Sequence, residues 1–124
     1  MSGLNFKDLT VTNLTIREMS NFFNIPYKTV YSWNTGHRTP PGYVVELMLY
    51  KWEHRLFTYY IDQLNYKGLE NFAYFKAKLG KNLKFFSEFY NIPYKTIQCW
   101  NTGHRTPPEY VIELMLYKYY CECL

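Results

Sequence analysis

The chain has few of the residues that mark disulfide-stapled or metal-binding proteins. It contains three cysteines, Cys99, Cys121 and Cys123, in 124 residues. An odd, unevenly placed set is typical of reduced thiols in a cytosol. Only one residue separates Cys121 from Cys123, whereas zinc sites typically leave about two to four and need further ligands nearby. The sequence therefore predicts no disulfide framework, no metal and no cofactor.

Long apolar runs are also missing. No stretch approaches the ~20 apolar residues of a membrane-spanning helix. Met1 to Leu9 shows no basic region followed by an apolar run, so no signal peptide is expected. The net charge is only +4, which is compatible with nucleic acid and argues against an acidic mimic of DNA. We therefore expect a cytoplasmic protein with no membrane partner.

Signatures of catalysis are absent from the sequence. No Ser/His/Asp or Cys/His arrangement, phosphate-binding loop or carboxylate pair stands at a useful spacing, so an enzyme is not expected. Aromatic residues are instead abundant, at 21% of the chain with 14 tyrosines. Helical units of ~60 residues bury only ~60% of their unfolded surface, so large rings are needed to fill thin cores. The alternative is an exposed aromatic surface for a partner or for base stacking.

An internal repeat organises the chain. Residues 24–51 read NIPYKTVYSWNTGHRTPPGYVVELMLYK, and residues 91–118 read NIPYKTIQCWNTGHRTPPEYVIELMLYK. Five of these 28 positions differ: Val30/Ile97, Tyr31/Gln98, Ser32/Cys99, Gly42/Glu109 and Val45/Ile112. We call the two segments the first and second repeat. Two copies predict a pseudo-symmetric pair, in effect a homodimer on one chain, with domains at residues 1–61 and 62–124. Whether two whole chains also pair as a homodimer is left open.

Upstream of each repeat, apolar residues recur at helical spacing and predict a first helix. They are Ile16, Met19, Phe22 and Phe23 in the first copy and Leu83, Phe86, Phe89 and Tyr90 in the second. Thr15 with Glu18 fits a capping box, and Asn82 is the matching N-cap candidate. The Ile-Pro dipeptide that follows must end this helix, because the residue before proline is pushed out of the α region.

A second, short helix is predicted over residues 27–33 and 94–100, because proline is favoured at a helix start. Val30 and Trp33 share one face of it, which should be buried. Gly36, and its equivalent in the second copy, should end the helix in a left-handed conformation.

A third helix is predicted to start at Thr39 and at Thr106, each an N-cap before proline. Thr106 and Glu109 fit a capping box. The first copy has no such box, because Gly42 stands at the position of Glu109. This helix is apolar on more than one side, which predicts that it packs on two neighbours, between the copies. In the first copy the apolar pattern continues through Ile61.

The remaining segments complete an all-α fold. Residues 54–68 are interpreted as the joint between copies, residues 69–79 as an opening helix ended by Gly80, and residues 4–9 as its shorter counterpart. The predicted architecture is two tandem helix-turn-helix repeats packed as a pseudo-two-fold pair.

The repeated motif resembles the small helix-turn-helix proteins of the lambda-repressor-like (Xre-type) superfamily. It is most similar to short phage and mobile-element proteins of Firmicutes with the run I-P-x-[KR]-T-[IV]-Q-x-W-x-x-G-x-R-x-P-P-x-Y. The resemblance covers residues 15–53 and 82–120. Two departures stand out: Tyr31 replaces the expected Gln, and Asn34 and Asn101 replace an acidic residue that often follows the Trp.

The resemblance implies a DNA-reading surface, because the second helix of this motif lies in the major groove. The implied residues are Tyr27, Lys28, Tyr31 and Ser32 in the first copy and Tyr94, Lys95, Gln98 and Cys99 in the second. These positions lie off the buried face, and their helix begins with unpaired N–H groups that attract phosphate. Gln98 can pair with adenine in a bidentate way. Further backbone contacts are predicted for Thr29, Thr96, Arg38 and Arg105.

Simpler interpretations of these residues remain. Lys28 and Lys95 are alternatively ordinary solvated charges, and Thr29 and Thr96 local caps. Arg38 and Arg105 alternatively pair with Glu46 and Glu113 or cap a helix end. His37 and His104 are interpreted as turn residues.

Two functions from different classes follow. The leading hypothesis is a regulator from a phage or mobile element that binds double-stranded DNA. The alternative is a protein-binding antagonist of host defence, such as an anti-CRISPR inhibitor that occupies the DNA-recognition surface of an effector nuclease. The modest charge, the excess of tyrosine and the altered Tyr31 position favour this alternative over a plain repressor.

Overall fold

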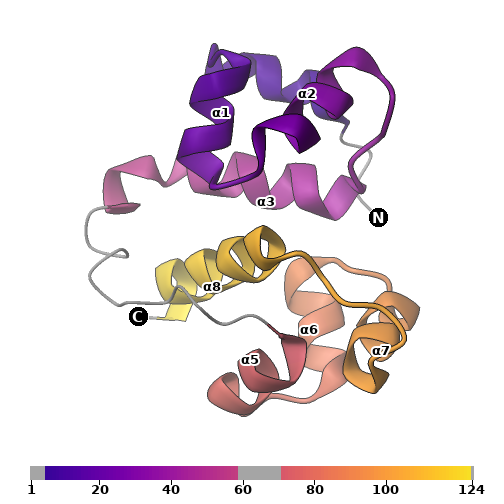
Figure 1. The fold of residues 1–124 in the computed structure, drawn as a ribbon. Helices are drawn as coiled ribbons and strands as arrows, with labels where there is room; N and C mark the ends of the chain where they lie inside the picture. Colours follow the sequence, from indigo (N-terminus) through magenta and orange to yellow (C-terminus); the bar gives the residue numbers. More distant parts are fainter. Residues whose placement is uncertain (1–4, 59–70, 124) are drawn as a thin grey trace.

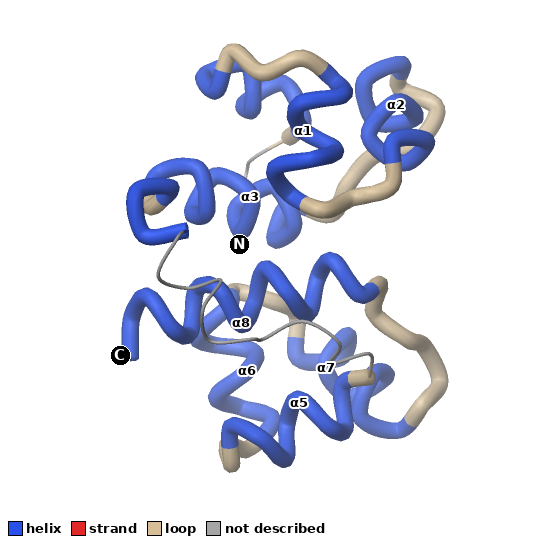
Figure 2. The backbone as a smooth tube through the Cα atoms, turned by 60° about the vertical axis from the view of Figure 1, so that its left-hand side comes forward, coloured by secondary structure: helices blue, strands red, loops and turns tan. Residues whose placement is uncertain are grey.

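The computed structural model describes residues 5–58 and 71–123, and these residues form helices and turns with no strand (Figures 1 and 2). The predicted all-α class is therefore confirmed. The first copy contains η1 (Phe6–Thr12), α1 (Ile16–Phe23), α2 (Tyr27–Thr35), α3 (Gly42–Glu53) and η2 (Arg55–Phe57). The second copy contains α5 (Phe72–Leu79), α6 (Leu83–Tyr90), α7 (Tyr94–Thr102) and α8 (Glu109–Cys123).

The helices that precede the repeats begin where the sequence predicts. At α1, the Thr15 hydroxyl accepts from the Glu18 N–H at 3.1 Å, and the Glu18 carboxylate accepts from the Thr15 N–H at 2.9 Å. At α6, the Asn82 side chain accepts from the Phe85 N–H at 2.8 Å. Both caps satisfy N–H groups that a helix start leaves unpaired, and both predictions are confirmed.

The turn from α1 to α2 has the same construction as the turn from α6 to α7. Asn24 and Asn91 take left-handed conformations with φ of 55° and 56°, which Asn tolerates better than most residues. The Ser20 hydroxyl donates to the carbonyl of Ile25 at 2.6 Å, and Ser87 makes the same 2.6 Å bond in the second copy. Identical local sequence therefore gives the two short helices the same relative orientation.

The short helices α2 and α7 begin at Tyr27 and Tyr94 as predicted and run two residues further than expected, to Thr35 and Thr102. Gly36, with φ of 84°, closes α2 in the predicted left-handed conformation. The predicted start of the third helix of each copy is wrong. Neither Thr39 nor Thr106 caps a helix, because α3 begins at Gly42 and α8 at Glu109.

The double proline explains the late start of α3 and α8. Each first proline precedes a second, and a residue before proline is excluded from the α region. The helix can therefore begin only after Pro41, whose carbonyl accepts from Val44 and Val45, and Pro108 plays the same part for α8. In the first copy α3 ends at Glu53, earlier than the apolar pattern indicated.

The opening segments agree with the sequence in outline. Residues 6–12 form the short 3-10 helix η1, which is the expected stub, and α5 ends at Gly80 with φ of 65° as predicted. The predicted helix starts at residues 4 and 69 are wrong, because Asn5 and Asn71 are extended N-cap residues and the helices begin at Phe6 and Phe72. The joint beyond Thr58 and the domain boundary at 61/62 lie outside the described residues.

Helices α3 and α8 lie side by side at the centre of the molecule and point the same way (Figures 1 and 2). This places the long apolar helix of each copy between the copies, as predicted. Trp33 and Trp100 are each only 7% exposed, which confirms that both rings belong to the core. Each long helix is also tied to its own copy: the Lys51 ammonium donates to the Phe22 carbonyl at 2.9 Å, and Lys118 to the Phe89 carbonyl at 3.0 Å.

Two hydrogen bonds between the copies join equivalent residues. The Asn24 amide donates to Glu113 at 2.6 Å, and the Asn91 amide donates to Glu46 at 3.2 Å. Asn24 and Asn91 are equivalent positions of the two repeats, and so are Glu46 and Glu113. These two bonds join α3 and α8 to the turn that precedes the short helix of the other copy.

Candidate nucleic-acid or protein interface

Helices α2 and α7 present their polar faces outward because their apolar faces are anchored in the core. Val30 and Ile97 are fully buried. Lys28 and Lys95, which lie off that face, are exposed. In both ribbon and tube views, α2 and α7 lie towards the same side of the molecule, near the ends where α3 and α8 begin (Figures 1 and 2). Both short helices thus lie near the same end of the α3 and α8 pair.

The first copy carries an exposed stack of aromatic rings, which we call the α2 surface (Arg17, Tyr27, Lys28 and Tyr31). Tyr27 and Tyr31 are 43% and 53% exposed, and their ring centroids lie 6.2 Å apart at an interplanar angle of 24°. The Arg17 guanidinium lies 5.2 Å from the centre of the Tyr27 ring. The rings of the α2 surface thus face solvent rather than the core.

The matching face of the second copy has different chemistry, and we call it the α7 surface (Tyr94, Lys95, Gln98 and Cys99). Gln98 is exposed and Cys99 is half-buried. Both line a hollow of about 410 Å³ that Lys95 also borders. Where the α2 surface has a ring and a hydroxyl, the α7 surface has an amide and a thiol beside an open hollow.

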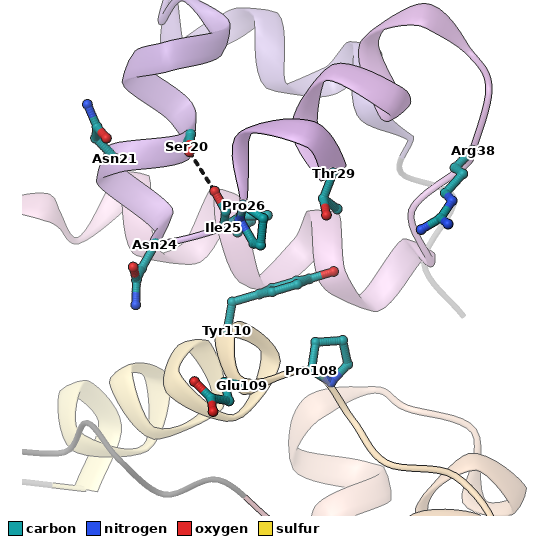
Figure 3. A pocket seen from close by; sticks show the side chains of 10 residues that line it. All are labelled: Ser20, Asn21, Asn24, Ile25, Pro26, Thr29, Arg38, Pro108, Glu109 and Tyr110. Atoms are coloured by element: carbon teal, nitrogen blue, oxygen red, sulfur yellow. Dashed lines mark hydrogen bonds between the residues drawn. The ribbon is translucent and has the colours of Figure 1, made fainter.

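A groove of about 740 Å³ separates α2 from the second copy (Figure 3). One wall comes from the α1–α2 turn and includes Asn24 and Thr29; the other comes from the start of α8 and includes Glu109 and Tyr110. In Figure 3 the Tyr110 ring projects from α8 toward Thr29 and Arg38. Residues far apart in the sequence thus form one polar surface beside α2.

Arg38 and Arg105 each affect the pKa of a tyrosine of the other copy, and only the pair of Arg38 and Tyr110 lines the groove. Burial, which has the largest effect, and the nearby Tyr110 together raise the pKa of Tyr43 to about 12, and Arg105 opposes the rise. Burial also raises the pKa of Tyr110, and Arg38 opposes that rise. Both phenols therefore stay protonated at neutral pH and can donate hydrogen bonds near the two guanidinium groups.

Most of the predicted site residues lie on accessible surface. Tyr27, Lys28, Tyr31, Arg38, Tyr94, Lys95, Gln98 and Arg105 are exposed, whereas Thr29, Ser32, Thr96 and Cys99 are half-buried. The structure places Thr29 on the wall of the groove rather than on the outer face of α2.

The alternative partners of the arginines are engaged elsewhere, because Glu46 accepts from Asn91 and Glu113 accepts from Asn24. His37 lies 3.4 Å from the Thr35 hydroxyl, and His104 lies 3.1 Å from that of Thr102, as expected of turn residues.

Sequence reasoning missed Arg17, Asn24, Glu109 and Tyr110 as parts of this surface. Only Glu109 left a signal, since it is one of the five positions at which the repeats differ. Arg17 and Asn24 belong to α1 and to the turn before α2, whereas Tyr110 reaches this surface only through the packing of the two copies.

Other kinds of site find little support in the part of the chain that the structure describes. No group of three His, Cys, Asp or Glu side chains could hold a metal ion there. Among those same residues, no helix has the length and apolar character needed to cross a membrane. All three cysteines are free thiols.

No protein-family model, curated protein or solved structure matches this chain.

Proposed function

We propose that this protein binds double-stranded DNA through two helix-turn-helix units related by a pseudo-two-fold axis, as a regulator from a phage or mobile element acting in the bacterial cytoplasm. The observation that carries the proposal is the position of α2 and α7 towards one side of the molecule, one from each copy. Dimeric helix-turn-helix proteins place two recognition helices on one duplex in this way.

The matched contacts between copies support the pseudo-two-fold relation. The edge-on contact of Trp33 with Tyr110, at 6.1 Å between ring centroids, is repeated by Trp100 and Tyr43 at 6.0 Å. A two-fold axis between α3 and α8 would produce such reciprocal pairs. If a residue of the first copy contacts a residue of the second, the two equivalent residues in the opposite copies then make the same contact.

The cations of this side suit a phosphate backbone. Lys28 and Lys95 are exposed at the starts of α2 and α7, where unpaired N–H groups and the helix dipole add to the positive potential. Arg38 and Arg105 are exposed in the loops that follow these helices. Four cations in matched positions can contact the backbone on both sides of a duplex.

The test compares two variants that lose the same charge. The double variant Lys28→Ala/Lys95→Ala should weaken binding to a fluorescent mixed-sequence duplex at low salt. The control Arg55→Ala/Lys78→Ala removes two exposed cations outside α2 and α7 and should bind nearly as the wild type does. Equal loss in both variants, or no binding by the wild type, would exclude the proposed DNA contact.

The second candidate is a protein-binding antagonist of host defence, for example one that occupies the DNA-recognition surface of a CRISPR effector nuclease. It is favoured by the α2 surface, because exposed Tyr and Arg side chains are enriched in protein interfaces. A pull-down from host lysate with and without nuclease treatment separates the candidates. Nuclease-resistant capture of one protein, lost in Tyr27→Ala/Tyr31→Ala and coupled with no DNA binding, would favour the antagonist.

A further inference from the structure

The five differences between the repeats are not scattered over the structure. Two of them, Val30/Ile97 and Val45/Ile112, are fully buried exchanges of one aliphatic side chain for another. The other three positions are exposed or half-buried: Tyr31/Gln98, Ser32/Cys99 and Gly42/Glu109. The chemistry that distinguishes the copies therefore lies at the surface.

Glu109 belongs to the second repeat but lies beside α2 of the first. It lines the same groove as Asn24, Pro26 and Thr29, because the start of α8 packs against the α1–α2 turn (Figure 3). The reciprocal contact of Tyr43 with Trp100 brings the start of α3 to α7. There the position equivalent to Glu109 is Gly42, which has no side chain.

At each of the three surface positions that differ between the repeats, one residue therefore lies on the side of α2 and the other on the side of α7. The side of α2 combines Tyr31 and Ser32 with the carboxylate of Glu109 from the other copy. The side of α7 combines Gln98 and Cys99 with Gly42 and no carboxylate. The packing of the two copies therefore places residues from separate parts of the sequence together, and the side of α2 differs in chemistry from the side of α7.

We infer that the α7 side reads base sequence and that the α2 side contacts the DNA backbone without reading it. The target is then a duplex with one specified half-site and one unspecified half-site. This inference rests on the proposed DNA binding and adds the division of work between the copies.

The chemistry of the α7 side fits base reading. The Gln98 amide carries a donor and an acceptor, which can pair with N7 and the N6 amino group of adenine in the major groove. Gln98 is exposed at the edge of an open hollow, so a base edge can approach it. One bidentate contact discriminates between bases by about 5- to 150-fold.

The chemistry of the α2 side opposes base reading. Tyr31 has no amide, and its ring stacks on Tyr27 rather than standing alone. Glu109 adds a carboxylate to the groove beside α2, and this negative charge makes the groove less favourable for a phosphate. The exposed Lys28 and Arg38 remain for phosphate contacts that carry no sequence information.

The repeats themselves supply the variants for a test, since each substitution installs a residue that the other copy already carries on the same scaffold. Tyr31→Gln/Glu109→Gly gives the α2 side two of the three residues that distinguish the α7 side, and Gln98→Tyr replaces the amide of the α7 side by the ring of the α2 side. Val45→Ile, a buried difference, is the matched control. Thermal melts of each variant check that the fold persists.

The readout is selection of binding sites from a random duplex pool. The wild type and Val45→Ile should select sites with one conserved half, and Tyr31→Gln/Glu109→Gly should select an inverted repeat with both halves conserved. Gln98→Tyr should lose about 5- to 150-fold of the preference while it keeps its affinity for mixed-sequence DNA. A wild-type site with two equal halves, or an unchanged preference in Gln98→Tyr, overturns the division of work but leaves DNA binding intact. Failure of the wild type to bind any duplex overturns both proposals.

Discussion

Tyr110 of the second copy lies edge-on against Trp33 of the first, with ring centroids 6.1 Å apart and an interplanar angle of 72°. Tyr43 meets Trp100 in the same way, at 6.0 Å and 71°. Each tryptophan therefore serves both the core of its own copy and the contact with the other. Edge-to-face geometry of this kind adds to the stabilisation that burial alone provides.

Replacing Trp33 or Trp100 by Ala should lower the free energy of unfolding by about 3–5 kcal/mol, because a buried ring is lost and a cavity remains. Urea melts followed by circular dichroism measure the change. Tyr74→Ala is the control, since that ring is 61% exposed. A near-neutral effect of both tryptophan variants would show that the rings do not lie in the core.

Replacing Lys51 by Met should cost about 1–3 kcal/mol of stability, because Met keeps the aliphatic length but leaves the buried Phe22 carbonyl without its donor. Lys118→Met removes the equivalent bond to Phe89. The cost should be smaller there, because Lys118 is half-buried whereas Lys51 is buried. Lys7→Met, at an exposed position, is the control. A larger loss in Lys118→Met than in Lys51→Met would contradict the ranking by burial.

Stability should fall as pH rises from about 10 to about 12, in part because of Tyr43. Its pKa is raised from 10.0 to about 12 in the folded protein. The neutral phenol is therefore favoured by folding; this contribution is complete below pH 10 and is lost as pH approaches 12. Urea melts across this range should show a shallower fall for Tyr43→Phe than for the wild type or Val45→Ile. An unchanged pH dependence in Tyr43→Phe would argue against the raised pKa.

DNA binding should depend steeply on salt if the four matched cations contact phosphates. Lys28, Lys95, Arg38 and Arg105 together predict a slope of about −3.6 for the logarithm of the binding constant against the logarithm of salt concentration. Each cation replaced by Ala should reduce the magnitude of the slope by about 0.9. Anisotropy titrations from low to moderate salt measure it, and a slope near zero would exclude these phosphate contacts.

Much of the local structure was predictable because it depends on residues within one turn of each other. The cap at Thr15 requires only Glu18, and the closure of α2 requires only Gly36. The wrong start at Thr39 is also instructive. Two local preferences competed there, and the exclusion of the α region before Pro41 outweighed the capping preference of threonine.

The surface beside α2 could not be predicted in the same way. Asn24 and Glu113 are 89 positions apart in the sequence and yet share a 2.6 Å hydrogen bond. The apolar pattern of α3 and α8 indicated two neighbours for each helix but not which residues of the other copy would meet it. A helix with apolar residues on several sides has several faces available for packing.

The sequence by itself determined the helical class, the repeat, the turns at Asn24 and Gly36 and the burial of both tryptophans, because short-range sterics, capping and apolar spacing decide these features. Only the tertiary structure decided that α3 and α8 run side by side and that Glu109 lies next to α2. The physical reason is that the free energy gained by burying apolar surface between the copies depends on the total area of the two faces that meet, and not on any local stretch of sequence. It therefore brings the polar residues at the edges of those faces together, whatever their separation along the chain.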